Sequence, residues 1–247
     1  MRIAVSSSTF RRPLAAAELT QLEWLDLCAS ELDLDGVLFD TRHFARTDAD
    51  YLAQLKKTAV DLGLTVTGLV APDLPSAGEA PFEMALALGA PIVVADAPPA
   101  TGDPAAWSAF TAALKPAVAA GKRLNVTVAL RNGPSTLCAS AADCKRLAKD
   151  IDSAWLRFAT DATAFGTLDK IEELATKTVL ATHTIENLET FARDDDAEAR
   201  RLLDSLRGFR GFVAVDRGDA DGERDAFHRA IGRLRGLLAR IELETLA

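Results

Sequence analysis

Strand and helix patterns alternate along this chain from end to end, and this alternation constrains the fold more than any other feature. Short apolar runs with strand character recur, and each is followed by apolar residues at helical spacing. The expected strands cover residues 3–7, 36–40, 64–70, 91–95, 124–130, 156–160, 178–182 and 211–215. Eight such units without a linker predict a single α/β domain over residues 1–247, a (β/α)8 TIM barrel.

The helices between these strands have recognisable ends. Thr47-Asp48 is expected to cap one helix, and Asp103 with Pro104 starts another, which should run to about residue 120 with Gly121 after it. Pro116 lies inside this pattern and predicts a kink or an early stop. The acidic run 194–196 is interpreted as a helix start, since acidic residues suit the first turn. An open doubly wound sheet is not favoured, because the loop at residues 6–10 lacks glycine.

Composition excludes several classes of function. The net charge of −8 argues against a nucleic-acid partner, and no apolar run is long enough for a membrane span. Cys28, Cys138 and Cys144 form no C-x-x-C pair, so free thiols in a reducing compartment are expected. Since the N-terminus has no signal-peptide pattern, the expected location is the cytoplasm.

In a barrel of this kind, the reactive residues lie where the strands end. The strand-end residues are Ser7 or Ser8, Asp40, Asp96, Arg131, Asp161, His183 and Asp216, and the loops just beyond carry Arg11, Arg12, Arg42, His43, Glu186 and Arg217. Asp161, His183 and Asp216 could bind a divalent metal, whereas the arginines suit an anionic ligand. The charges could also simply pair with one another. For the set as a whole, a ligand-binding mouth is favoured.

The chain resembles a known family, in its strand–helix rhythm over the whole length and in a few local stretches. The stretch Leu-Asp-Leu-Asp-Gly-Val-Leu-Phe-Asp at 32–40, followed by residues 55–63 and by Leu-Thr-Val-Thr-Gly-Leu at 64–69, is similar to the opening of the xylose isomerase-like TIM barrels. These are sugar phosphate isomerases and epimerases, with hydroxypyruvate isomerase, tagatose epimerase, inosose dehydratase and endonuclease IV as relatives. The resemblance implies a divalent metal at the barrel mouth, held by residues that end strands five to eight.

The resemblance also assigns these ligands, and the chain departs from the pattern. Asp161 and His183 match the family's strand-six and strand-seven ligands, and Glu186 stands where the family often has a further carboxylate. Asp216 replaces the strand-eight Glu, and Arg131 replaces the strand-five Glu. Those two glutamates are the acid/base pair of the family's epimerases, so the pair is lost here.

Arg131 decides what this site can bind. An arginine has no lone pair to donate, and its fixed charge repels a cation. We therefore expect Arg131 to occupy the space of the metal and to pair with Asp161 and Asp216. No cofactor is expected, and Mn²⁺, Mg²⁺ or Zn²⁺ would bind only if Arg131 were displaced.

The sequence leaves two hypotheses about function. In the first, the chain is an isomerase or epimerase of a small hydroxy-carbonyl or sugar (phosphate) compound, in which Arg131 and Asp161 serve the reaction and His183, Glu186 or Asp216 is the base. The expected substrate-binding residues are Arg11, Asp40, Arg42, His43, Asp96 and Arg217. In the second, a non-catalytic barrel binds a small anionic ligand or a protein partner. The negative net charge argues against a nuclease related to endonuclease IV. A homodimer is a plausible assembly.

Overall fold

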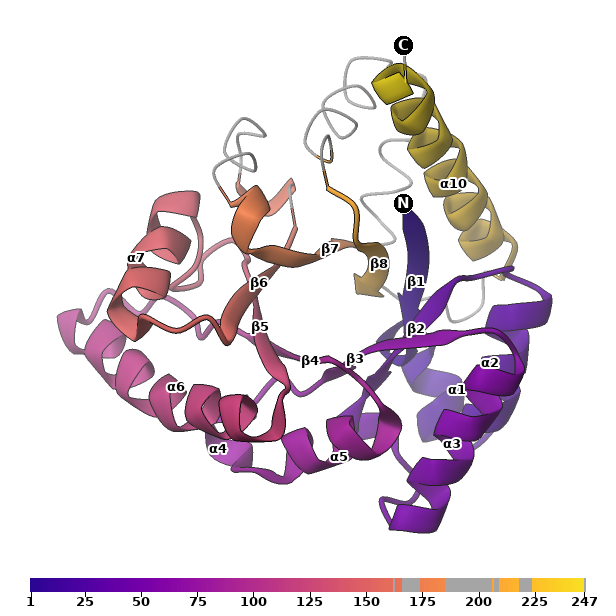
Figure 1. The fold of residues 1–247 in the computed structure, drawn as a ribbon, viewed down its shortest axis with the longest axis horizontal. Helices are drawn as coiled ribbons and strands as arrows, with labels where there is room; N and C mark the ends of the chain where they lie inside the picture. The colour runs from indigo at the N-terminus through magenta and orange to yellow at the C-terminus, as the bar shows by residue number, and fades with distance from the viewer. Residues whose placement is uncertain (162, 166–173, 185–205, 207–208, 218–223, 247) are drawn as a thin grey trace.

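The chain folds into a closed barrel of parallel strands surrounded by helices (Figure 1). This computed structural model describes residues 1–161, 163–165, 174–184, 206, 209–217 and 224–246. The strands follow one another around the barrel in sequence order, and β8 pairs with β1 to close it. The predicted (β/α)8 architecture is therefore confirmed.

The strands lie close to their predicted positions. They are β1 Arg2–Ser6, β2 Gly36–Asp40, β3 Thr65–Val70, β4 Ile92–Asp96, β5 Thr127–Arg131, β6 Leu156–Thr160, β7 Thr178–Thr184 and β8 Phe212–Arg217. Two differences concern the site. Strand β5 includes Arg131, and β7 extends past His183 instead of ending before it. The predicted helices over residues 168–175 and 194–208 lie wholly or largely outside the described residues.

The described helices cover the outside of the barrel (Figure 1). They are α1 Arg11–Ala15, α2 Gln21–Ser30, α3 Ala49–Asp61, α4 Leu74–Ala77, α5 Ala80–Leu88, α6 Pro104–Leu124, α7 Ala141–Ile151 and α10 Arg224–Leu246, with short 3-10 helices η1 Ser7–Phe10, η2 Thr41–His43, η3 Thr163–Phe165 and η5 Ala175–Lys177. In the described part of the chain, no helix combines the length and the apolar character that a bilayer span requires.

Helix starts are fixed by side chains that accept backbone N–H groups. The predicted caps are confirmed: the Asp48 side chain accepts from the Tyr51 N–H, and the Asp103 side chain accepts from the Ala105 N–H with Pro104 as the next residue. Thr20 and Ser140 add capping boxes at the starts of α2 and α7. Such caps satisfy donors that a helix leaves without partners.

Helix α6 is longer than the sequence suggested. It continues through Pro116 and ends at Leu124, where Asn125 adopts a left-handed conformation with φ of 58°. The expected end near residue 120 was wrong. Gly121 lies inside the helix, where a Cβ atom would come within 2.5 Å of the Val126 carbonyl oxygen. The glycine therefore permits close packing of α6 on the chain that enters β5.

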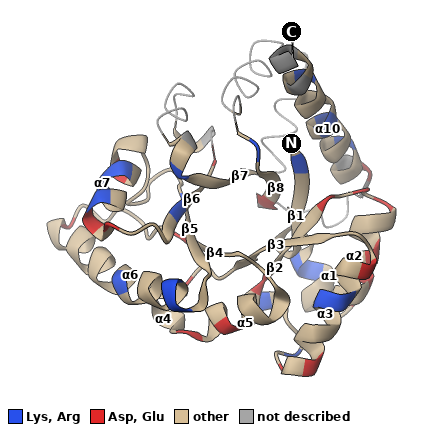
Figure 2. Ribbon diagram, in the orientation of Figure 1, with Lys and Arg blue, Asp and Glu red and all other residues tan. Residues whose placement is uncertain are grey.

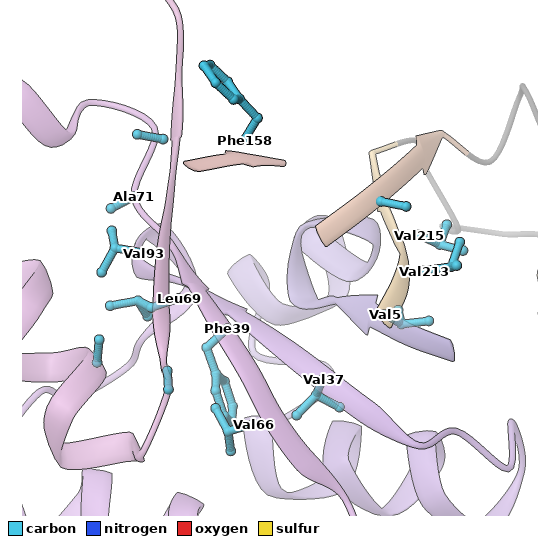
Figure 3. Packing of buried hydrophobic residues seen from close by; sticks show 14 of the residues in the cluster. Val5, Val37, Phe39, Val66, Leu69, Ala71, Val93, Phe158, Val213 and Val215 are labelled. Carbon is cyan, nitrogen blue, oxygen red and sulfur yellow. The ribbon is translucent and has the colours of Figure 1, made fainter. Parts of the chain in front are cut away.

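Alternation along the strands divides the core into two layers. Side chains such as Val37, Phe39 and Val93 point toward the helices (Figure 3) and belong to a large cluster between the strands and the helices. A smaller cluster of Ala4, Leu38, Val70, Ile92, Val94, Ala129, Ala159, Leu180 and Ala214 fills the barrel interior. In Figure 2, the ribbon segments coloured for charged residues lie mostly on the outer helices, while most of the strand ribbon is uncharged.

The same alternation determines which strand-end residues face inward. Asp96 lies two residues after the interior Val94, and Arg131 lies two residues after the interior Ala129. Asp216 follows the interior Ala214 in the same way. Since successive side chains alternate between the two faces of a strand, these charged groups continue the inner layer at the C-terminal end of the barrel.

We predict that Gly121→Ala lowers the free energy of unfolding by about 1–3 kcal/mol, because the added methyl group overlaps the Val126 carbonyl oxygen. Gly232 lies exposed in α10, with no atom within 4 Å of the position that a Cβ would take, and is the matched control. Gly232→Ala should raise stability by roughly 0.5–1 kcal/mol through helix propensity. Urea unfolding of both variants measures the difference, and equal effects would contradict the close packing.

Candidate functional site

A pocket of about 600 Å³ opens at the C-terminal ends of the strands. Its lining comes from several strand–helix units and consists of Ser8, Arg11, Arg42, His43, Asp96, Ala97, Pro99, Arg131, Asn132, Gly133, Thr136 and Asp216. The pocket lies where barrel enzymes of this architecture place their active sites, and its size suits a small molecule.

Arg131 forms the floor of this pocket together with two carboxylates. Its Nε donates to Asp96 Oδ1 at 2.8 Å, and its Nη1 donates to Asp216 Oδ2. Asp96 and Arg131 are direct neighbours in the pairing of β4 with β5, whereas Asp216 reaches Arg131 from β8. The Arg131 side chain is 4% exposed and that of Asp216 is 1% exposed, but Asp96 remains 45% exposed toward the mouth.

Burial and the nearby carboxylates shift the pKa of Arg131 in opposite directions. Burial disfavours the charged guanidinium, but the carboxylates of Asp216 and Asp96 outweigh this effect and raise the pKa of Arg131 above its ordinary value. Arg131 is therefore a permanent cation. The second carboxylate oxygen of Asp216, Oδ1, is buried without a hydrogen-bond partner among the described residues.

The ion pairs of Arg131 differ in one partner from those expected from the sequence. In the described part of the chain, the ion pairs of Arg131 are with Asp96 and Asp216, so the expectation of an Asp161 pair was wrong and Asp96 takes that place. Asp161 is held through its backbone: its N–H donates to Asn132 Oδ1 at 2.7 Å, and its carbonyl oxygen accepts from Asn132 Nδ2 at 2.9 Å. Asn132 thus joins the ends of β5 and β6.

A second ion pair lies at the end of β2. Arg42 Nε donates to Asp40 Oδ1 at 3.0 Å and Arg42 Nη2 donates to Asp40 Oδ2 at 2.5 Å, so the pair is bidentate. Asp40 is fully buried, while the Arg42 side chain is 58% exposed and lines the pocket. The hydrogen bonds to Asp40 raise the pKa of Arg42, which stays charged and faces the mouth beside Arg11.

His43 follows this pair and also lines the pocket. Its Nδ1 lies 3.4 Å from Ser7 Oγ, and Ser7 Oγ accepts the Asp40 N–H at 2.9 Å. Burial lowers the pKa of His43; the nearby Arg42 and Arg11 lower it further, against an opposing effect of Asp40. His43 is therefore a neutral imidazole near pH 7.

His183 is placed differently from the expected mouth residue. It is 1% exposed and is not among the described residues that line the pocket. In the pairing of β7 with β8 it lies beside Val215, whose side chain packs in the helix-facing cluster. Burial lowers the pKa of His183, although the charge of Asp161 opposes this shift. Asp161 is thus close enough for its charge to act on His183, and both are buried and are not among the described residues that line the pocket.

The structure does not describe the side chains of two predicted site residues. Glu186 lies outside the described residues, and Arg217 is the last residue of β8, with its side chain outside the description. Sequence reasoning did not assign roles to Asn132, Gly133 and Thr136, which follow β5 and form one wall of the pocket. The sequence feature that could have identified them is the polar run directly after β5. Pro99 reaches this wall through a bridge to Thr136.

The donor set does not fit the divalent metal of the resemblance. Among the described residues, no cluster of His, Cys, Asp and Glu side chains has an arrangement that could hold a metal ion. Where the resemblance has a carboxylate ligand, the chain has a guanidinium that donates to Asp96 and Asp216. A metal cation in that position would be repelled by the Arg131 guanidinium and would have to displace it from the two carboxylates.

Comparison with solved structures supports the fold. A D-tagatose 3-epimerase-like protein matches with a TM-score of 0.75 at 17% identity over 100% of both chains. A D-psicose 3-epimerase matches with a TM-score of 0.75 at 13% identity, covering 95% of this chain and 97% of the other. A xylose isomerase domain protein from Planctomyces limnophilus has a TM-score of 0.72 at 15% identity and 98% coverage of both chains.

These likenesses confirm the resemblance at the level of the fold: the chain shares the (β/α)8 barrel of these proteins. No protein-family model matches the sequence, and no curated protein is similar to it. Because fold does not fix function, the chemistry has to be argued from the pocket of this chain.

We predict that acid destabilises the protein through His183. Its pKa lies below the ordinary 6.5, so between these values the unfolded chain binds more protons than the folded one. Stability should therefore fall as the pH drops from about 6.5, by about 1.4 kcal/mol for each unit of pKa difference traversed. Urea unfolding at pH 7.5 and 5.5 measures this loss.

His183→Gln should reduce that pH dependence, because the variant lacks the buried imidazole. His228 lies exposed on α10, and His228→Gln controls for the loss of one histidine. If the wild type and His183→Gln lost the same stability over this range, the acid sensitivity would have another source.

Proposed function

We propose that this barrel binds a small anionic hydroxy-carbonyl compound, such as a sugar phosphate or a sugar acid, and isomerises or epimerises it without a divalent metal. The observation that carries the proposal is the buried Arg131, which lies at the floor of the mouth pocket between Asp96 and Asp216. The fold shared with sugar epimerases supports the same conclusion, since barrel enzymes place their active sites at this end of the strands.

The charges around the pocket favour an anion with hydroxyl groups. Arg42 and Arg11 stand at the rim and suit a phosphate or carboxylate. Asp96 is 45% exposed and can accept a ligand hydroxyl group. Positive groups at the rim with acceptors below them match a molecule that carries its charge at one end and its hydroxyl groups at the other.

Arg131 supplies the electrostatic part of the chemistry. Removing a proton next to a carbonyl group places negative charge on the carbonyl oxygen, and fixed donors aimed at that oxygen stabilise the resulting enediolate. Arginine has five N–H donors, and its Nε and Nη1 are engaged with Asp96 and Asp216. Donors on its remaining edge are suited to the developing oxyanion.

A second candidate function is non-catalytic binding of a small anion. Its support is that Arg131 engages both pocket carboxylates in ion pairs, so neither is free to act on a ligand. In that case the pocket would retain a ligand without changing it, or the barrel would serve a protein partner.

Proton exchange with solvent tests the proposal. The protein, treated with EDTA, is incubated in D₂O with hydroxypyruvate, dihydroxyacetone phosphate, fructose 6-phosphate or D-tagatose, and loss of the C–H signal is followed by NMR. We predict exchange with an anionic compound. Binding heat without exchange for every compound would overturn the catalytic proposal and favour the second candidate, and neither heat nor exchange would overturn both.

Arg42 and Arg46 provide a matched pair for the anion site. Both pair with an aspartate two residues away, but Arg46 is exposed and is not part of the described pocket lining. Arg42→Gln should weaken binding of the anionic compound roughly tenfold, about 1.4 kcal/mol, by removing a charged donor. Arg46→Gln should leave calorimetric affinity unchanged. Equal affinities of both variants would remove Arg42 from the site.

A further inference from the structure

The described pocket contains few groups that can take a proton from carbon. Asp96 and Asp216 are bound to Arg131, and Arg11 and Arg42 are cations that cannot act as bases at neutral pH. Both ends of the Asn132 amide are engaged with the backbone of Asp161. Other polar lining residues are occupied in the same way, as Thr136 Oγ1 is by the Gly133 carbonyl oxygen.

His43 differs from these residues. It lines the pocket at the end of η2, and its side chain makes one hydrogen-bonding contact with the described residues, that of Nδ1 with Ser7 Oγ. A serine oxygen has two lone pairs, so Ser7 Oγ can accept the Asp40 N–H and the Nδ1–H of His43 together. In that tautomer the Nε2 lone pair is left for a molecule in the pocket.

The charged groups near His43 keep the imidazole neutral when the pocket is empty. Arg42 and Arg11 oppose its protonation, Asp40 favours it, and half-burial of the ring opposes it. Asp40 is already neutralised by its bidentate pair with Arg42. A bound anion would add negative charge beside Arg42 and Arg11, so it would make His43 a stronger base in the complex than in the free protein.

We propose that His43 is the catalytic residue that exchanges a proton with the substrate through Nε2, with Ser7 as its positioning residue. This inference rests on the proposed function and names a proton-transfer residue that the sequence had assigned only to substrate binding. It replaces His183 and Asp216 in that role, since His183 is outside the described pocket lining and Asp216 is paired with Arg131.

The step balances without a further reactant. Nε2 of His43 forms a bond to the proton on the carbon next to the carbonyl group, and the C–H electron pair moves into the C–C bond as the carbonyl π pair moves to oxygen. The enediolate oxygen is then stabilised by Arg131, and the imidazolium by the negative charge of the bound anion. The proton held by the imidazolium can exchange with solvent at this point. Return of a proton from Nε2 to the neighbouring carbon, as the enediolate hydroxyl proton moves to the former carbonyl oxygen, gives the isomer and restores neutral His43.

The D₂O exchange assay tests this assignment with His43→Gln, and His228→Gln is the matched control on α10. We expect exchange by His43→Gln to fall about 100-fold or more, whereas His228→Gln should exchange at the wild-type rate. In the wild type, the exchange rate should also decline at acidic pH as His43 becomes protonated. Ser7→Ala should lower the rate and shift this acidic limb while leaving anion affinity unchanged.

The outcomes separate this inference from the proposed function. Exchange at the wild-type rate by a folded His43→Gln variant would overturn the role of His43 and leave the isomerase proposal standing. Absence of exchange by the wild type would overturn the proposed function and the inference with it. Circular dichroism and the thermal midpoint of each variant establish that it is folded, and His43→Asn repeats the test if His43→Gln is not.

Discussion

The site is organised by one buried positive charge. Arg131 lies on the inner face of β5 at the end of the barrel, where desolvation alone would make a guanidinium costly. Asp96 from the neighbouring strand and Asp216 from β8 compensate for that cost, so groups from β4, β5 and β8 form one ion-pair cluster. Removing one member of such a buried pair typically costs about 3–5 kcal/mol, because the remaining charge is left without a partner. A substitution that removes one charge of this cluster should therefore also destabilise the C-terminal end of the barrel.

The same cluster limits the chemistry at the mouth. Asp96 and Asp216 are both engaged by Arg131, and a cation that used these carboxylates as ligands would have to displace the guanidinium. What the pocket retains is a set of anion-binding arginines and a neutral His43 held by Ser7. These groups are the ones on which the proposed proton transfer depends, and in that proposal the guanidinium takes the electrostatic role that a metal often fills.

Much of this arrangement could be predicted from local patterns. The strands ending at Asp40 and Thr160 and the caps at Asp48 and Asp103 follow from alternation and capping chemistry, which are properties of neighbouring residues. The partners of Arg131 could not be predicted in the same way, because the choice of Asp96 over Asp161 depends on the register between strands. His183 was expected to end a strand, yet β7 continues to Thr184 with a register shift beside His183. A shift of this kind decides which face a side chain occupies.

The central claim is that Arg131 takes the place of a divalent metal. Calorimetric titration of the purified protein with Mn²⁺ tests it most directly, with Arg131→Glu measured alongside. We predict no stoichiometric binding by the wild type at micromolar Mn²⁺, and at least tenfold tighter binding by Arg131→Glu, which replaces the guanidinium with a carboxylate beside Asp96 and Asp216. Stoichiometric, micromolar binding of Mn²⁺ by the wild type would contradict the account, since it would require Arg131 to leave its two carboxylates.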